Sequence, residues 1–180
     1  MGALDFDIVE RKPKVPLPRV DPDTKKLFAK GTRILLITAH PDDSEFYVGG
    51  TLTRLGKSAD IHQVIVTDGD KTYYWIFTNA AENRRVRRIE AKEALDTWGG
   101  ESLDFLGYPD GRLHVSDELV DKLVAKIQAY RPDYVLAFDP DFPPRVSHSD
   151  HRRAGEAALL AVQKAGVPLW HMMFSTVAPN

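Results

Sequence analysis

Apolar residues occur along the chain in two alternating kinds of run. Short continuous runs, such as Ile34–Thr38, are typical of strands that are buried on both faces. Longer segments place apolar side chains three or four positions apart, as with Leu119, Leu123 and Ile127, and this spacing is typical of helices that pack on one face. The pattern predicts strands near residues 33–38, 60–67, 102–106, 133–138 and 169–175, and helices near residues 45–57, 80–98, 116–130 and 149–164.

Strands that alternate with helices predict an α/β fold with a mainly parallel sheet. Residues 1–30 contain four prolines within a short stretch and show little periodicity. We therefore expect an extended N-terminal arm over residues 1–30 and a single domain over residues 31–180. In parallel α/β sheets, ligands bind beyond the carboxyl ends of the strands. This rule directs attention to four segments: residues 40–43, 68–70, 108–110 and 139–151.

Composition narrows the classes of function. The chain has 180 residues, with 24 basic and 26 acidic side chains, and its net charge of −2 argues against general nucleic-acid binding. No apolar run approaches the roughly 18 residues that would span a bilayer, and no signal peptide is visible, so we expect a cytoplasmic protein. Cysteine is absent, so any tight transition-metal site must use His, Asp and Glu.

Two of the strand ends carry a distinctive set of side chains. His40, Asp42 and Asp43 follow the first strand, and His148, Asp150 and His151 follow the fourth. A hydrolytic zinc site needs about three nitrogen or oxygen ligands and an open position for water. His40 and Asp43 can reach one ion across a strand-to-helix turn, and two histidines three positions apart can face one cleft. The residues alone leave open which of these side chains are ligands.

Such a set can hydrolyse an amide. Zinc lowers the pKa of its water from 15.7 to about 7, and Asp42, next to a ligand, is placed to take a proton from that water. His148 is the natural cation to stabilise the oxyanion that forms. We expect Asp150 to hydrogen-bond this imidazole and raise its pKa.

Longer motifs point to a family. The stretch ITAHPDDSEFYVGGTLTRL, with VTDGD, LDFLGYPDGRL and HSDHRRAG downstream, resembles the LmbE-like/PIG-L zinc-dependent N-deacetylases. These enzymes remove an acetyl group from compounds that contain N-acetylglucosamine. The resemblance implies a Rossmann-like three-layer sandwich and one Zn²⁺ per chain, although another divalent transition metal is an option. Carried over by motif position, it implies three metal ligands (His40, Asp43, His151), the general base Asp42, and the oxyanion-stabilising His148 with Asp150 as its partner.

The chain also departs from the family pattern. Many members have Glu at the position of Ser44, and most continue with a further strand and helix beyond the position of Asn180. We therefore expect the C-terminal part of the usual family domain to be short or absent. Another subunit can complete the substrate pocket in that case, which makes a homo-oligomer one option.

Four further residues near strand ends are candidate substrate contacts, each with an ordinary structural alternative. Asp70 and Asp110 are typical turn residues as well. Arg87 lies in a basic run that suits a solvated helix face and an ion pair with Glu90. Trp75 lies in an aromatic segment that can pack as core or form a pocket rim. The four candidates are Asp70, Arg87, Asp110 and Trp75.

The sequence predicts a zinc-dependent hydrolase that removes an N-acetyl group from an amino-sugar conjugate. A nucleotide-binding module is disfavoured because the first strand leads into His40–Asp43, where a Gly-rich turn is needed. Two alternatives remain open: a receiver-like domain that binds Mg²⁺ through paired acids, and a non-catalytic carbohydrate-binding relative. The kind of metal and the release of acetate discriminate among these three functions.

Overall fold

In the part of the chain that the structure describes, five strands form one sheet in the order β3–β2–β1–β4–β5, and every neighbouring pair is parallel. The computed structural model describes residues 26, 29–71, 79–141 and 148–172. The strands are β1 (Arg33–Thr38), β2 (Asp60–Thr67), β3 (Ser102–Tyr108), β4 (Tyr134–Phe138) and β5 (Leu169–Met172). The predicted parallel α/β fold is confirmed.

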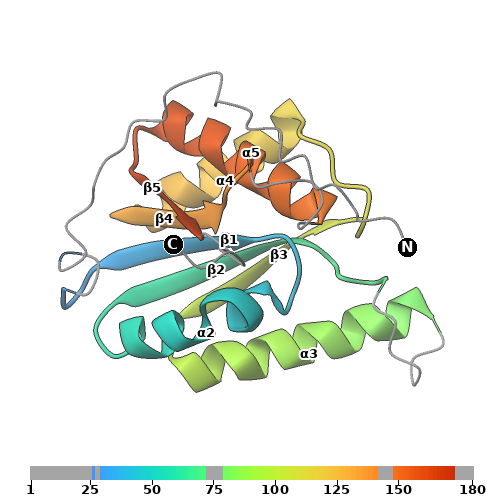
Figure 1. Cartoon of the computed structure of the whole chain (residues 1–180), viewed down its shortest axis with the longest axis horizontal. Coiled ribbons are helices and arrows are strands. Elements are labelled where there is room, and N and C mark those ends of the chain that lie inside the picture. The colour runs from blue at the N-terminus through green and yellow to red at the C-terminus, as the bar shows by residue number, and fades with distance from the viewer. Residues whose placement is uncertain (1–25, 27–28, 72–78, 142–147, 173–180) are drawn as a thin grey trace, which may run out of the picture.

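Helices cover both faces of the sheet, as Figure 1 shows. They are α2 (Asp43–Leu55), α3 (Ala80–Trp98), α4 (Asp117–Tyr130) and α5 (Ser149–Ala165). The pair α2 and α3 packs on one face, and the pair α4 and α5 packs on the other (Figure 1). This arrangement is the three-layer sandwich that the resemblance implied.

The apolar runs in the sequence form the centre of the sheet. Residues 34–37 of β1 and Val135 and Ala137 of β4 have no exposed surface, because helices cover both faces of these strands. Polar residues then set the helix ends. The side chains of Asn79 and Ser116 cap α3 and α4, and Gly99 ends α3 in the left-handed conformation that favours glycine.

The boundaries of α2 and β3 differ by two residues from the expected ones. Helix α2 begins at Asp43, two residues before Glu45, and the side chain of Asp43 accepts hydrogen bonds from the backbone N–H groups of Ala39 and His40, which directly follow β1. Strand β3 continues to Tyr108 through a bulge that contains Gly107 at φ +77°. One extra residue in β3 lets the strand pass a turn-like glycine without ending. Strand β5 is described to Met172, and residues 173–175 lie outside the described part.

The order of the strands fixes where a site can form. The chain moves from β1 outward to β3 and then returns to place β4 on the other side of β1, so the topology reverses between β1 and β4. Gly155 in α5 allows this helix to approach the end of β4, because a Cβ atom there would lie 2.2 Å from the carbonyl oxygen of Phe138. The first turn of α5 therefore reaches the carboxyl end of β1.

Candidate metal centre and pocket

Three side chains converge at the point where the topology reverses. His40 follows β1, Asp43 begins α2 and His151 lies in the first turn of α5. His40 Nδ1 lies 3.1 Å from His151 Nε2, which in turn lies 3.0 Å from Asp43 Oδ1. His40 Nδ1 is 3.6 Å from Asp43 Oδ2, and all three residues are buried. The structure thus brings the three expected ligands into one small triangle.

The spacing of these atoms fits a metal ion. Zinc bonds of about 2.0–2.1 Å in a tetrahedron place neighbouring ligand atoms about 3.3 Å apart. His151 Nε2 lies 3.1 Å from His40 Nδ1 and 3.0 Å from Asp43 Oδ1, close to this spacing. Two imidazole nitrogens and a carboxylate are also a donor set that zinc and related transition metals accept. Residues His40, Asp43 and His151 are therefore a candidate metal centre.

Backbone and ring contacts hold these ligands in place. Asp43 Oδ2 accepts hydrogen bonds from the backbone N–H groups of Ala39 and His40, at 2.9 and 2.7 Å, which leaves Oδ1 to face His151. The ring of His151 stacks on Phe138, with centroids 4.2 Å apart and planes 4° apart. The site therefore has fixed geometry before any ion binds.

The electrostatics of the triangle favour a cation. Burial alone would raise the pKa of Asp43, but the facing imidazoles of His151 and His40 hold it well below its usual range. Burial also disfavours a charged imidazole, yet the three surrounding carboxylates raise the pKa of His40 to about 11. A positive charge, from a proton or from a metal ion, is thus strongly stabilised here.

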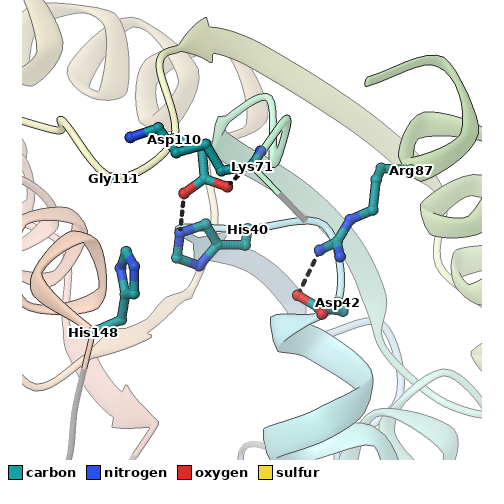
Figure 2. A pocket seen from close by; sticks show the side chains of 7 residues that line it. All are labelled: His40, Asp42, Lys71, Arg87, Asp110, Gly111 and His148. Atoms are coloured by element: carbon teal, nitrogen blue, oxygen red, sulfur yellow. Dashed lines mark hydrogen bonds and ion pairs between the residues drawn. The ribbon is translucent and has the colours of Figure 1, made fainter. Parts of the chain in front are cut away.

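Asp42 occupies the N-cap position of α2 but makes no capping hydrogen bond with its side chain. Its Oδ1 atom instead lies 2.8 Å from a terminal guanidinium nitrogen of Arg87, which reaches across from α3 (Figure 2). Asp42 is 62 % exposed, whereas the side chain of Arg87 is only 6 % exposed. Asp42 therefore pairs with Arg87, for which an ion pair with Glu90 was the structural alternative expected from the sequence.

His148 and Asp150 are arranged differently from the expectation. The backbone N–H of Asp150 donates to His148 Nδ1 at 3.2 Å, while the Asp150 carboxylate accepts from the backbone N–H groups of Gly111 and Leu113. Burial is the largest cause of a lowered pKa at His148, and the neighbouring His40 adds to it. The Asp150 carboxylate favours a charged His148, but its effect is smaller, so the pKa of His148 is lowered where a rise was expected.

A pocket of about 430 Å³ opens above His40. Figure 2 shows His148 on one side of His40 and the pair of Asp42 and Arg87 on the other. The volume is within the range of small-molecule sites. Its lining consists of His40, Asp42, Lys71, Arg87, Asp110, Gly111 and His148.

The four candidate substrate contacts have different positions. Asp110 and Arg87 line the pocket. Asp70 is turned toward α3, where Oδ2 lies 3.2 Å from a terminal nitrogen of Arg84, and it does not line this pocket. Trp75 lies outside the described residues, as does most of the expected arm over residues 1–30. The substrate-binding roles of all four residues stay predictions.

Sequence reasoning missed Lys71 and Gly111 as pocket residues. The ammonium group of Lys71 packs against Gly111, where a Cβ atom would lie 2.8 Å from Nζ (Figure 2). Gly111 has a φ of +71°, and its N–H donates to the buried Asp150. The one available signal was that they are next to Asp70 and Asp110 at strand ends. A single lysine or glycine in a turn does not indicate a binding site, so this signal was not enough to predict them.

The protein is an α/β sandwich with a candidate His–Asp–His metal centre at the carboxyl edge of its sheet. Residues 35–162 match the family model described as PIG-L: GlcNAc-PI de-N-acetylase, so the chain belongs to this family. The family that the motifs suggested is thereby confirmed.

Curated relatives carry related names. The chain is 31 % identical to diacetylchitobiose deacetylase of Thermococcus kodakarensis over 84 % of its own length and 57 % of the relative. It is 28 % identical to a probable N-acetyl-alpha-D-glucosaminyl L-malate deacetylase 2 of Bacillus cereus, over 73 % of the chain and 61 % of the relative. The chain therefore spans little more than half the length of these relatives.

A solved structure shows the same fold. The N,N'-diacetylchitobiose deacetylase from Pyrococcus horikoshii, complexed with its inhibitor MPG, superposes with a TM-score of 0.73 and 31 % sequence identity. The match covers 79 % of this chain and 54 % of that one.

Within the described ranges, none of the helices has the length and apolar character needed to cross a bilayer.

Proposed function

We propose that this protein is a zinc-dependent hydrolase that removes an N-acetyl group from a conjugate containing N-acetylglucosamine. The observation that carries the proposal is the convergence of His40 Nδ1, Asp43 Oδ1 and His151 Nε2 next to a pocket that His40 and Asp42 line. Family membership and the deacetylase names of the relatives support the same reaction.

The donor set favours zinc over magnesium. Two imidazole nitrogens face the centre, whereas Mg²⁺ prefers an octahedron of oxygen ligands. This argues against the receiver-like alternative, which depends on paired acids and leaves His151 without a role. When bound, zinc supplies a Lewis acid that polarises a carbonyl oxygen and lowers the pKa of water to about 7.

In this proposal, Asp42 accepts a proton and His148 stabilises the negative charge that develops on the substrate. The exposed carboxylate of Asp42 accepts the proton of the attacking water as the oxygen bonds to the amide carbon. His148, on the other side of His40 (Figure 2), donates a hydrogen bond to the developing oxyanion. The carbon–nitrogen bond then breaks, and the leaving amine takes a proton from Asp42 or His148.

The relatives and the pocket support an N-acetylated amino sugar as the substrate class. The relatives named above act on diacetylchitobiose or on an N-acetylglucosaminyl malate, so an N-acetylated amino sugar is the shared chemical group. A pocket of about 430 Å³ lined by charged and polar groups suits a hydroxyl-rich ring. A cytoplasmic location, expected from the sequence, belongs to the same proposal.

Acetate release tests the proposal. The zinc-loaded chain is incubated with N-acetylglucosaminyl malate, N-acetylglucosaminyl inositol and diacetylchitobiose, and acetate is measured enzymatically. We expect turnover of at least one substrate, and Asp42→Asn is expected to lower kcat by about 10²–10⁴-fold, the usual contribution of a positioned general base.

Asp96→Asn is the matched control, because Asp96 is exposed on α3 and pairs with Lys92 one turn away on the same helix. It should keep wild-type kcat. Binding of these sugars by the zinc-loaded wild-type chain without acetate release would support the non-catalytic relative and overturn the proposal. An Asp42→Asn variant with unchanged kcat would remove Asp42 from the mechanism.

A further inference from the structure

We propose that Asp110 and Asp150 act on the metal centre through His40, by holding the ring proton of His40 on Nε2 so that Nδ1 is the ligand atom. Asp110 was expected to bind substrate, and Asp150 to serve His148. The inference rests on the metal site proposed above and concerns how this chain's own side chains prepare it. Both carboxylates are positioning residues in this view.

The two ring nitrogens of His40 face different surroundings. Nδ1 faces the other two ligands of the triangle, His151 and Asp43. Nε2 lies 3.3 Å from Oδ1 of Asp110 and 3.5 Å from Oδ2 of Asp150. Neither contact has the alignment of a full hydrogen bond, so Nε2 points between the two acceptors.

This arrangement selects one form of a neutral imidazole. A neutral ring carries its proton on one nitrogen and can bind a metal only through the other. Two acceptor oxygens beside Nε2 stabilise the proton there and leave the lone pair of Nδ1 for the metal. Carboxylates that orient a ligand histidine in this way also increase its basicity, and their loss typically costs 10–100-fold in metal affinity.

Backbone N–H groups in the segments that follow β2 and β3 bind both carboxylates and fix their positions. Asp150, only 1 % exposed, accepts hydrogen bonds from the N–H groups of Gly111 (2.6 Å) and Leu113 (3.3 Å), which ties the segment after β3 to the start of α5. Asp110 lies in that segment, and its Oδ2 accepts from the N–H of Lys71 after β2 at 3.2 Å. The free Oδ1 atom of Asp110 is thereby aimed at His40 (Figure 2).

Two other interpretations explain less. His40, Asp110 and His148 are close enough to hold a second ion, but His40 would then bind metal through both nitrogens and carry no proton. The alternative that the Asp150 carboxylate orients His148 is less well supported, because His148 Nδ1 accepts its hydrogen bond from the backbone N–H of Asp150 and not from the carboxyl group. Holding the proton on His40 Nε2 accounts for the position of both carboxylates.

Zinc affinity tests the inference without relying on activity. Dissociation constants are measured by chelator competition for the wild-type chain, Asp110→Asn and Asp110→Ala. We expect zinc to bind about 10–100-fold more weakly to Asp110→Ala. Asp110→Asn should lose an intermediate amount of affinity, because its single amide oxygen can accept from His40 Nε2 or from the N–H of Lys71 but not from both. Nitrogen-15 NMR of the zinc-loaded wild-type chain should show the His40 proton on Nε2.

Asp139→Asn is the control for general loss of negative charge, since Asp139 lies at the end of β4 and accepts from the N–H of Asp141, which an amide oxygen also does. It should bind zinc with wild-type affinity. A wild-type chain that binds no zinc would overturn the proposed function itself. Tight zinc binding by the wild type, unchanged in both Asp110 variants and accompanied only by a higher KM, would overturn this inference and return Asp110 to substrate binding.

Discussion

At the scale of single residues, the contact between Asp42 and Arg87 has the most direct bearing on catalysis. The exposed carboxylate of Asp42 contacts the guanidinium of Arg87, which is almost fully buried. The buried arginine therefore fixes the position of the Asp42 side chain. Arginine keeps its charge at all accessible pH values and presents a rigid planar fork. Arg87 is therefore suited to hold one oxygen of Asp42 and leave the other for the reaction.

Substitution of Arg87 should lower kcat more than it changes KM. Arg87→Met keeps most of the buried stem but frees Asp42 to rotate, and we expect kcat to fall about 10–100-fold, since small misplacements of catalytic groups have effects of this size. Arg87→Lys should recover part of the loss because it keeps the charge. Steady-state acetate release measures both variants.

Arg85→Met is the control for Arg87, because Arg85 lies on the same helix, is exposed and pairs with Glu82. Its kcat should match the wild type. A higher KM with unchanged kcat in Arg87→Met would assign Arg87 to substrate binding, as the sequence suggested.

Individual residues differ in how far the sequence can place them. His40 and Asp43 lie just after the first predicted strand, and His151 lies at the start of the helix that follows the fourth, so the predicted topology brings them to one edge of the sheet. Arg87 lies in the middle of α3, and its long side chain reaches Asp42 only because α3 packs beside α2. The contacts of Asp150 depend on the path of the segment after β3, which no periodic pattern encodes.

At the scale of elements, the approach of α5 to β4 sets the position of His151. Glycine is required where the two meet, because a Cβ atom at Gly155 would lie 2.2 Å from Phe138 O and 2.9 Å from its carbonyl carbon. Helix boundaries were predictable where a cap or a glycine marks them, as at Ser116 and Gly99. The continuation of β3 through Gly107 was not, because a bulge and a turn share the same residue type.

Gly155→Ala should destabilise the fold and displace α5. Overpacking of this kind costs about 1–3 kcal/mol, measured as a lower urea midpoint with an unchanged slope. Gly50→Ala is the matched helical control, since no atom lies within 4 Å of a Cβ built there. This control should gain about 0.5–1 kcal/mol from helix propensity. Equal stability of the two variants would show that α5 can shift at no cost.

At the scale of the whole molecule, the ligands join separate halves of the chain. His40 and Asp43 follow β1, whereas His151 belongs to α5, and 111 positions separate the two histidines. The general layout was predictable from the alternation of strands and helices. The expected arm and the oligomeric state stay predictions.

Metal removal should therefore weaken the whole fold. A ligand at 100 times its dissociation constant adds about 2.7 kcal/mol to the free energy of unfolding. For a chain of this size, that corresponds to about 5–10 °C in Tm. Calorimetry with zinc and with excess chelator measures the difference. Asp43→Asn should show almost no response to zinc, and a wild-type chain whose Tm ignores zinc would contradict a metal centre that links the two halves.

The position of His151 late in the chain has a consequence for biosynthesis. A nascent polypeptide that has not yet released α5 from the ribosome holds only two of the three candidate ligands, on β1 and α2. Capture of the ion then waits until almost the entire sheet has been translated. Metallation would follow translation of α5, and truncated products that end before it would lack the third candidate ligand.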